Sequence, residues 1–326
     1  MSRVVLVTGA ANIESAIFAR HLSDRGADAG IRRVVAVDTT LPTTDLGGAK
    51  FIRADIRTPV IGKVLAVEDV DTVVHLGPSP ARKATGSTKE LNVIGTMQLL
   101  AACQRSEHLK KFVLGSSTAV YGTSPRDPAV WRESGTARGG AKTGYPREVV
   151  EVESYTRGFA RRRPDVTVTT LRFSQVLARG SQAPLARYFR APALPSVLGF
   201  DPRLQFLHFD DALNVLTRAA IEDKPGTYNV AGEGIIMLSQ AARLLGKPTI
   251  PLPPVGVGAL IRSTMRAMGS DVSPGLERVL TYGGAVDTSA LRTKFGYTPV
   301  HSTRDTFDEF ATTLRPGILH LGGMPR

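Results

Sequence analysis

The hydrophobic residues in the first half of the chain form short apolar runs separated by longer segments of helical periodicity. Short runs rich in Val, Ile and Leu are typical of buried strands, whereas apolar positions three or four residues apart indicate helices. The runs predict strands at residues 4–7, 34–37, 50–52, 72–75, 111–114 and 166–172. The intervening segments predict helices at residues 15–24, 61–66, 89–103 and 145–163. We therefore expect an α/β fold with a doubly wound parallel sheet, which places ligands at the carboxyl ends of its strands.

The pattern changes after Arg172, where the predicted elements become shorter and Pro and Gly more frequent. No internal repeat or low-complexity linker separates the two parts, so we expect the second part to pack on the first and to form one wall of a cleft. The sequence predicts two domains: residues 1–172 with the sheet, and residues 173–326 as a smaller mixed substrate-binding region. Some segments of the second part are allowed to return to the first.

The segment TGAANIES lies between the first predicted strand and the first predicted helix. A pyrophosphate-binding turn of the Rossmann type requires this context, because amides at the helix N-terminus then face the phosphates. Gly9 suits the tight turn, while Asn12 and Ser15 replace the usual second and third glycines. Asn tolerates a left-handed backbone, so we expect Gly9, Ala11, Asn12 and Ile13 to contact a dinucleotide. The alternative is an ordinary turn that binds nothing.

Asp38 comes directly after the second predicted strand. An acidic side chain at this place accepts hydrogen bonds from the adenosine ribose hydroxyls, which favours NAD over NADP as the cofactor. The alternative is a solvated turn aspartate ahead of Thr39 and Thr40. The position of Asp38 relative to the Gly9 turn favours the first interpretation.

Further motifs follow one another along the chain, at residues 54–56, 74–77, 92–96, 115–122, 171–173, 206–211, 228–230 and 296–299. In order and spacing they resemble the extended short-chain dehydrogenase/reductase family, the group of NAD-dependent sugar-nucleotide epimerases and dehydratases. The resemblance spans nearly the whole chain. It implies an NAD-binding enzyme acting on a hydroxyl or keto group of a small molecule, for example a sugar nucleotide, by epimerisation, dehydration or reduction. It also implies a homodimer formed through the helices at residues 89–103 and 145–163.

The same resemblance implies roles for single residues. The catalytic residues it implies are Ser117 and Tyr145. The further cofactor contacts it implies are Asp55 and Ile56 at the adenine edge, Leu76 and Gly77 beside the pyrophosphate, and Asn92 and Ser116.

One position departs from the family pattern. The family pairs its tyrosine with a lysine four residues later, whose ammonium lowers the pKa of the phenol; here Val149 follows Tyr145 at that spacing. Without a cation, a phenol with an ordinary pKa near 10 is mostly protonated at neutral pH, so it is a poor base that can still donate a proton. Arg147 points to another face, and Lys142 lies on the preceding loop. The alternatives are a redox-silent member of the family, and a Tyr145 that merely lines a pocket.

The net charge of +12 makes anionic partners plausible without choosing among them. The densest basic run, Arg157 with residues 161–163, ends a predicted helix, where cations complement the helix dipole. We therefore favour a solvated helix end over a nucleic-acid site. Arg179, Arg187 and Arg203 are candidate contacts for an anionic substrate.

The remaining candidate chemistry is interpreted as structural. The single cysteine, Cys103, lies in an apolar helical run, which indicates a packed thiol. With no secretory segment and no membrane span in the sequence, we expect a cytoplasmic protein. His208 with Asp210 and Asp211 has the spacing of a strand entering a helix capped by an aspartate, so no metal site is predicted. His75 is expected to be a structural residue at a strand end.

Overall fold

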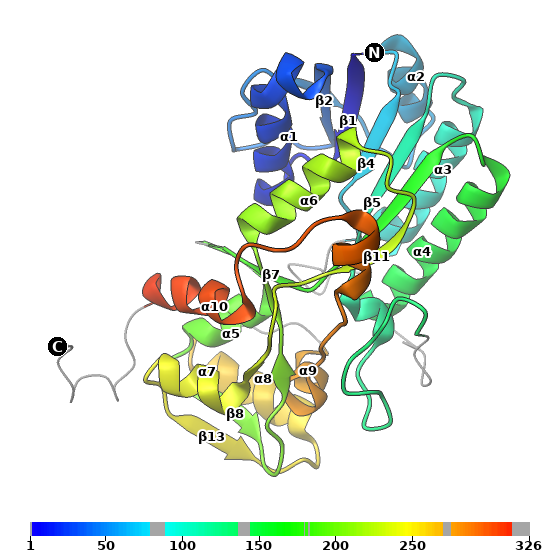
Figure 1. Cartoon of the computed structure of the whole chain (residues 1–326). Coiled ribbons are helices and arrows are strands. Elements are labelled where there is room, and N and C mark those ends of the chain that lie inside the picture. Colours follow the sequence, from blue (N-terminus) through cyan, green and yellow to red (C-terminus); the bar gives the residue numbers. More distant parts are fainter. Residues whose placement is uncertain are drawn as a thin grey trace.

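The structure is a computed structural model that describes residues 2–78, 89–135, 144–178, 180–181, 183–269 and 275–314. An upper part is built around a parallel sheet, and a lower part consists of short helices and strands (Figure 1). The motifs singled out in the sequence lie mainly in the upper part and at its lower edge.

A seven-stranded sheet forms the centre of the upper part, and all of its neighbouring strands are parallel. Its spatial order is β11-β6-β5-β4-β1-β2-β3. The strands are β1 (Arg3–Thr8), β2 (Ile31–Asp38), β3 (Lys50–Arg53), β4 (Thr72–His75), β5 (Lys111–Ser117), β6 (Thr167–Phe173) and β11 (Gly226–Val230). The order reverses between β1 and β4, which in such sheets is the place where a ligand binds. The six predicted strands and the doubly wound α/β fold are confirmed.

Helices cover both faces of this sheet (Figure 1). On one face, α1 (Ile13–Arg25) and α6 (Phe209–Ile221) bury apolar side chains in one core with β1 and β2. On the other face, α2 (Val60–Val67), α3 (Gly95–Arg105) and α4 (Tyr145–Arg162) share a second core with the same sheet. A short π-helical turn, Glu90–Ile94, precedes α3. Cys103 is fully buried in the second core, which confirms its interpretation as a packed residue.

The lower part has a core of its own, in which Phe189, Phe206 and Phe307 pack ring against ring. Its helices are α5 (Pro184–Arg190), α7 (Leu238–Leu244), α8 (Val257–Ala267), α9 (Leu276–Tyr282) and α10 (Thr303–Thr312). Its strands pair in three two-stranded sheets: β7 (Gln175–Leu177) with β10 (Phe206–His208), β9 (Arg203–Leu204) with β12 (Ile236–Met237), and β8 (Leu194–Val197) with β13 (Thr249–Leu252). Short helical turns lie at Gly26–Ala29, Thr118–Tyr121 and Leu291–Phe295.

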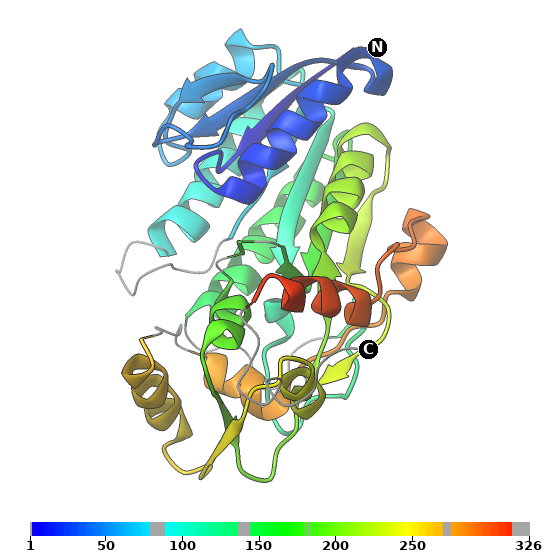
Figure 2. The ribbon, with the colours of Figure 1, turned by 90° about the vertical axis from the view of Figure 1, so that its left-hand side faces the viewer.

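The chain returns to the sheet after residue 172. Both α6 and β11 lie beyond that residue in the sequence, yet one covers the sheet and the other extends its edge beside β6 (Figure 2). This is the return that the sequence expectation allowed. The lower part is therefore connected to the sheet by several chain crossings, which bring it against the carboxyl ends of the strands.

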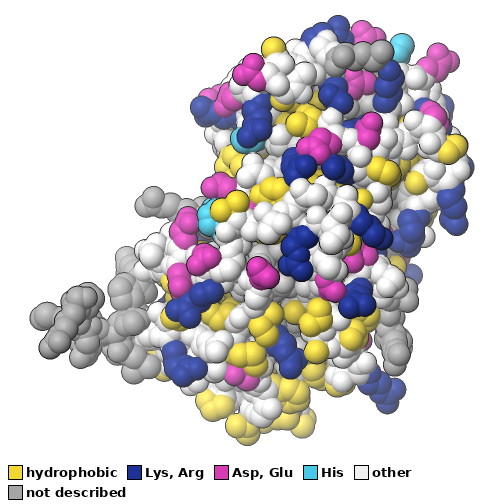
Figure 3. All heavy atoms as spheres, viewed as in Figure 1, with side chains coloured by type: hydrophobic (Ala, Val, Ile, Leu, Met, Phe, Trp, Pro, Cys, Tyr) yellow, Lys and Arg dark blue, Asp and Glu magenta, His cyan; other side chains and the backbone are white. Residues whose placement is uncertain are grey.

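The surface charges are mixed. On the face shown in Figure 3, Lys and Arg side chains are spread over both parts and alternate with Asp and Glu. Within the described ranges, no helix is both long enough and apolar enough to cross a bilayer.

Candidate active site

The glycine turn lies at the carboxyl end of β1, next to the reversal of the strand order. Gly9 has a φ of +79°, a left-handed backbone that a glycine adopts without steric cost. The Asn12 amide donates to the Gly9 carbonyl at 3.0 Å, and α1 begins directly afterwards. Asn12 makes no side-chain cap on the helix. The first-turn amides of α1 therefore point out of the turn, as an anion site requires.

Asn12 and Ser15 stand at the places of the usual second and third glycines, and Asn12 does not adopt the conformation that the sequence led us to expect. Asn12 has a φ of −80° and is extended, so the left-handed tolerance of asparagine is not used here. Its side-chain nitrogen and the Ser15 hydroxyl each lie 3.6 Å from where a Cβ on Gly9 would be. Ser15 is buried and Asn12 is half-buried. The turn thus presents two polar side chains where the usual loop has bare backbone.

Asp38 connects the end of β2 to this turn. Its Oδ2 accepts a hydrogen bond from the Ala11 amide at 2.9 Å, and its Oδ1 accepts one from the Thr39 amide at 2.7 Å. The carboxylate is half-buried. Oδ1 also accepts from the Thr39 hydroxyl and the Thr40 amide, each at 3.3 Å. A carboxylate oxygen has about two acceptor positions, so Oδ2, with the Ala11 amide as its donor, is the oxygen that has room for another. The structure places Asp38 beside the glycine turn, as its spacing predicted.

Three other expected cofactor residues lie around the same strand ends. Leu76 follows β4, and its carbonyl oxygen would lie 3.5 Å from a Cβ on Gly9. Gly77 comes next, beside the ring of His75. Ile56 packs on Gly95 at the start of α3, where a Cβ would come within 2.9 Å of the Ile56 Cδ1 atom. A Cβ at this position would force the end of the Ile56 side chain to shift.

Asp55 is occupied by an ion pair. Arg57 bonds both of its carboxylate oxygens, with the shortest contact at 2.7 Å. This hydrogen bonding lowers the pKa of Asp55. The carboxylate is therefore held at the exposed turn after β3, and any adenine contact shares it with Arg57.

Ser117 and Tyr145 meet, although they come from different elements. Ser117 ends β5 and caps the following turn by accepting the Ala119 amide. Tyr145 begins α4, and its hydroxyl donates to the Pro78 carbonyl at 3.1 Å. Burial raises the pKa of Tyr145 to about 12, although a hydrogen bond from Ser117 opposes the shift. At neutral pH Tyr145 is thus a phenol and not a phenolate.

The residue four positions after Tyr145 is an apolar valine. Val149 is 0% exposed within α4. One residue earlier, the Glu148 carboxylate accepts a hydrogen bond from the Asn92 side-chain nitrogen at 2.7 Å. Asn92, expected as a cofactor contact, therefore also holds an acidic side chain on α4. The sequence analysis missed Glu148, because no local pattern connects residues 92 and 148.

Ser116 points away from the strand-end surface and is almost fully buried. Its hydroxyl donates to the Glu153 carboxylate at 2.7 Å. Arg172 bonds both oxygens of the same carboxylate, at 2.9 and 2.7 Å, and also bonds the Tyr121 hydroxyl at 2.8 Å. The Ser116 side chain is thus part of a buried polar network, and only its backbone remains for a cofactor. The signal for this network was Glu153 itself, a charge on the apolar face of a predicted helix.

His75 is structural, as expected. Its Nδ1 lies 2.7 Å from the Thr8 hydroxyl and its Nε2 lies 2.8 Å from the Thr96 hydroxyl. Complete burial lowers the pKa of His75 to about 4. A neutral ring with both nitrogens hydrogen-bonded is a connector between β1, β4 and α3 and not a base.

Asp211 ties the start of α6 to a distant segment. It is 0% exposed and accepts hydrogen bonds from the Tyr297 hydroxyl, the Val300 amide, and the amide and Nδ1 of His301. Burial opposes ionisation, but these hydrogen bonds hold the pKa of Asp211 below its usual value. The prediction that an aspartate caps α6 is wrong. His208 caps this helix, because its Nδ1 atom accepts a hydrogen bond from the Asp210 amide in the first turn.

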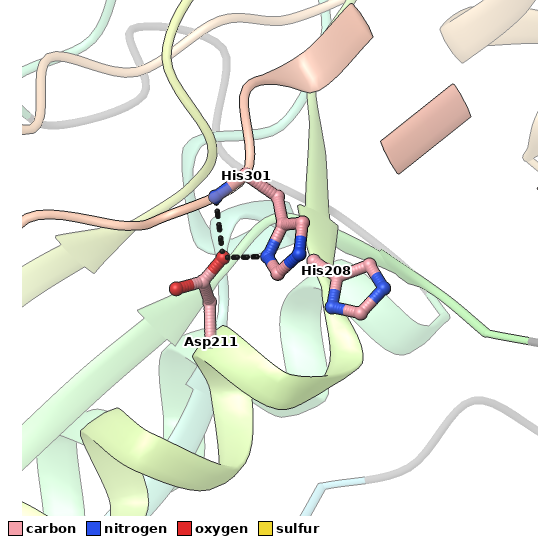
Figure 4. Close-up of side chains that lie close together, drawn as sticks. All are labelled: His208, Asp211 and His301. Atoms are coloured by element: carbon pink, nitrogen blue, oxygen red, sulfur yellow. Dashed lines mark hydrogen bonds and ion pairs between the residues drawn. The ribbon is translucent and has the colours of Figure 1, made fainter. Parts of the chain in front are cut away.

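His208, Asp211 and His301 form a cluster in which candidate metal-ligating atoms lie within 4.8 Å of one another (Figure 4). The two imidazole rings are stacked at 3.9 Å with an interplanar angle of 28°. A metal ion lies in the plane of each ligating ring at about 2 Å from nitrogen, and two nearly parallel planes do not meet that close to the rings. The carboxylate lone pairs are also taken by the four donors. The geometry supports a hydrogen-bonded clamp rather than a metal centre.

The basic candidates are distributed over several elements. Arg203 is exposed in β9, and Arg187 lies in α5 of the lower part. Arg179 and Lys142 lie outside the described residues.

Sequence comparison decides the family. The profile of the family described as NAD dependent epimerase/dehydratase matches residues 5–231, from β1 through the end of β11. The chain belongs to the NAD-dependent epimerase/dehydratase family. The match contains the glycine turn, Ser117 and Tyr145, so it covers the whole candidate site. The expected resemblance is confirmed, and so is NAD as the cofactor of the family.

Similar proteins occur among curated sequences and among solved structures. An uncharacterized protein of Mycobacterium tuberculosis is 39% identical over 315 residues, which cover 94% of this chain and 83% of that protein. Among solved structures, dTDP-glucose 4,6-dehydratase from Bacillus anthracis, in complex with NAD, has a TM-score of 0.70 at 16% identity over 96% of both chains. UDP-glucose 4-epimerase from Thermotoga maritima, with UDP-glucose, has a TM-score of 0.69 at 16% identity over 95% of this chain and 98% of the other. At these identities the structural similarity establishes the fold.

Proposed function

We propose that this member of the epimerase/dehydratase family uses NAD to act on a hydroxyl or keto group of a small molecule, with sugar nucleotides as the substrate class. The observation that carries the proposal is the contact of Ser117 with Tyr145 at the carboxyl edge of the sheet. Residues that meet there, near the Gly9 turn, are placed to act on a ligand bound across the strand ends. The sugar-nucleotide enzymes among the similar structures support the substrate class.

The residues at the strand ends fit a dinucleotide. The uncapped first turn of α1 supplies amide donors for the diphosphate, with Asn12 and Ser15 as additional polar side chains. Asp38 supplies an acceptor for the ribose hydroxyls at the end of β2. When bound, NAD supplies a hydride acceptor or donor for a substrate carbon.

Ser117 and Tyr145 orient the oxygen on that carbon. Because the pKa of Tyr145 is about 12, its hydroxyl is a proton donor at neutral pH. A proton donor suits the reductive direction, in which a keto oxygen becomes a hydroxyl. In the oxidative direction the phenol is a poor acceptor for the substrate proton.

Turnover with sugar nucleotides tests the proposal. The full chain is mixed with NAD and UDP-glucose, UDP-glucuronic acid or dTDP-glucose, and products are separated by chromatography while NADH is followed by absorbance. We expect conversion of at least one substrate, and a loss of about 10²-fold or more in kcat for Tyr145→Phe. Ser117→Ala is expected to lower kcat while leaving NAD affinity unchanged. Full turnover by both variants would contradict the assignment of these residues.

A second function is favoured by one observation, the fully buried Val149 at the lysine position. It is a redox-silent protein, in which NAD is structural and the pocket performs a non-redox step or senses a ligand. Val149→Lys discriminates the two functions in a protein that binds NAD but shows no turnover. Hydride transfer gained by Val149→Lys supports a repurposed site, whereas no gain indicates another chemistry.

The homodimer also remains part of the proposal. The outer surfaces of α3 and α4 expose Met97 and Tyr155, 38% and 42% exposed, beside a hollow of about 320 Å³. Exposed apolar side chains on two adjacent long helices are typical of an interface. We expect light scattering to show a dimer that Met97→Glu with Tyr155→Glu converts to a monomer. Val255→Glu, at an 85% exposed valine before α8, is the matched control that should leave the dimer intact.

A further inference from the structure

We propose that Glu148 gives the reacting centre a negative charge, so that the site holds the oxidised dinucleotide in preference to the reduced one. The inference rests on the proposed function, because it requires NAD across the strand ends. It concerns the charge of the site, and it applies whether or not hydride transfer is rapid.

The position of Glu148 is fixed from two sides. It lies three residues after Tyr145 on α4, and side chains at that spacing are neighbours on a helix surface. The Asn92 amide, from the π-helical turn before α3, donates to the Glu148 Oε2 atom at 2.7 Å. Asn92 is 7% exposed, so its own side chain is held by the surrounding packing. The carboxylate is therefore held beside the tyrosine and is not a freely moving surface group.

Among the described residues, no cation forms an ion pair with Glu148. Asn92 is its one hydrogen-bond partner there, and an amide stabilises a carboxylate without cancelling its charge. The adjacent Val149 is apolar where the family has an ammonium group. The effect of the charge also reaches the phenol, since Glu148 adds to the rise that burial causes in the pKa of Tyr145.

The two forms of the cofactor differ in one charge. The oxidised nicotinamide ring is a cation and the reduced ring is neutral, while the rest of the dinucleotide is identical. If Ser117 and Tyr145 hold the substrate oxygen, the nicotinamide ring must lie beside the carbon that carries this oxygen. A carboxylate next to Tyr145 therefore attracts the oxidised ring, and only that ring. Replacing the family's lysine with Val149 also shifts the binding preference toward the oxidised dinucleotide, because it removes a positive charge near the ring.

Binding of the two cofactor forms tests the inference without using activity. Dissociation constants for NAD⁺ and NADH are measured by isothermal titration calorimetry on the full chain and on Glu148→Gln, which keeps the size and the Asn92 hydrogen bond. We expect the wild type to bind NAD⁺ more tightly than NADH. In Glu148→Gln the preference should fall about tenfold, a change of about 1.4 kcal/mol, which is reasonable for one charge acting across several ångströms of partly buried protein.

Glu151→Gln is the matched control. Glu151 lies on the same helix and pairs with Arg147 on the surface at 2.7 Å, so its substitution should leave the preference unchanged. Val149→Lys should also lower the preference, because it adds a positive charge near the ring that offsets the charge of Glu148. Thermal melting of each variant checks that the fold is kept.

The outcomes separate this inference from the proposed function. If neither dinucleotide binds the wild type, the proposed function fails and the inference fails with it. If both bind and Glu148→Gln keeps the wild-type preference within twofold, the inference alone is overturned. A wild type that prefers NADH overturns it as well.

Discussion

The buried network around Glu153 predicts a large difference between two glutamates on one helix. Glu153 and Glu151 both lie on α4, two residues apart. Glu153 is 2% exposed and accepts from Ser116 and from both sides of the Arg172 guanidinium fork. Glu151 pairs with Arg147, whose side chain is 54% exposed. We predict that Glu153→Ala destabilises the protein severely and that Glu151→Ala hardly affects it.

The magnitude follows from what each truncation leaves behind. Removing Glu153 leaves the Arg172 guanidinium, itself 8% exposed on its side chain, in the interior without its anion. Burial would lower the pKa of Arg172, but its hydrogen bonds to the Glu153 carboxylate hold that pKa above its usual value, so the arginine stays charged. Breaking a buried pair in this way costs about 3–5 kcal/mol. A surface pair at this spacing on a helix contributes about 0.3–0.5 kcal/mol.

Urea unfolding at neutral pH measures both variants against the wild type. We expect the free energy of unfolding to fall by at least about 3 kcal/mol for Glu153→Ala and by less than about 0.5 kcal/mol for Glu151→Ala. Glu153→Gln should fall between them, because the amide keeps one acceptor for the arginine. A loss below about 1 kcal/mol for Glu153→Ala would refute the argument that Arg172 depends on this carboxylate.

Three further predictions concern the sheet and the α6 clamp. The pKa of His75 is about 4 in the folded protein and about 6.5 in the unfolded chain, so between these pH values the unfolded chain binds one proton more. The free energy of unfolding should therefore fall by up to about 3 kcal/mol as the pH drops from about 6.5 to about 4. His75→Gln should flatten this pH dependence in urea titrations. Gly9→Ala should cost about 1–2 kcal/mol and weaken NAD binding in calorimetry, because its φ is +79° while the space for a Cβ is adequate; Gly9→Asn should cost less. Asp211→Ala should expose residues 297–301 to faster hydrogen exchange measured by mass spectrometry, because four hydrogen bonds hold that segment to α6; unchanged exchange there would contradict the clamp.

The sheet was largely predictable because its strands are buried on both faces. Runs such as residues 4–7 and 34–37 consist of Val, Leu and Ala, which is typical of strands buried on both faces. β11 was not predicted as a strand, since Gly226–Val230 reads GTYNV and carries polar residues. Its Asn229 is 0% exposed because it accepts from the Tyr121 hydroxyl and donates to the Trp131 and Asp287 carbonyls. A strand stabilised by such long-range polar partners has no apolar signature.

The candidate site was predictable only where a motif carried it. Ser117 and Tyr145 were found through family resemblance, and the structure brings them together. The pairing of Asn92 with Glu148 spans 56 residues, and that of Asp211 with His301 spans 90. Neither pair follows a local periodicity, since each depends on which elements become neighbours after folding. The spacing of motifs in the sequence therefore identified the residues of the site, but it did not predict which charged side chains surround them.

The charges on α4 show that replacing the family's lysine with Val149 changes the charge of the reacting centre as well as the acidity of Tyr145. Two acidic side chains lie on either side of Val149, and they have different partners. Glu153 is fully buried, where an unpaired carboxylate would be very costly, and Arg172 neutralises it. Glu148 is only half-buried, so water and the Asn92 amide suffice to stabilise its charge. A lysine at position 149 would have brought the reacting centre close to neutrality, whereas a valine leaves Glu148 as the charge that acts on Tyr145 among the described residues. The substitution thus leaves the centre with a net negative charge, and the redox state of the bound cofactor is where that charge becomes measurable.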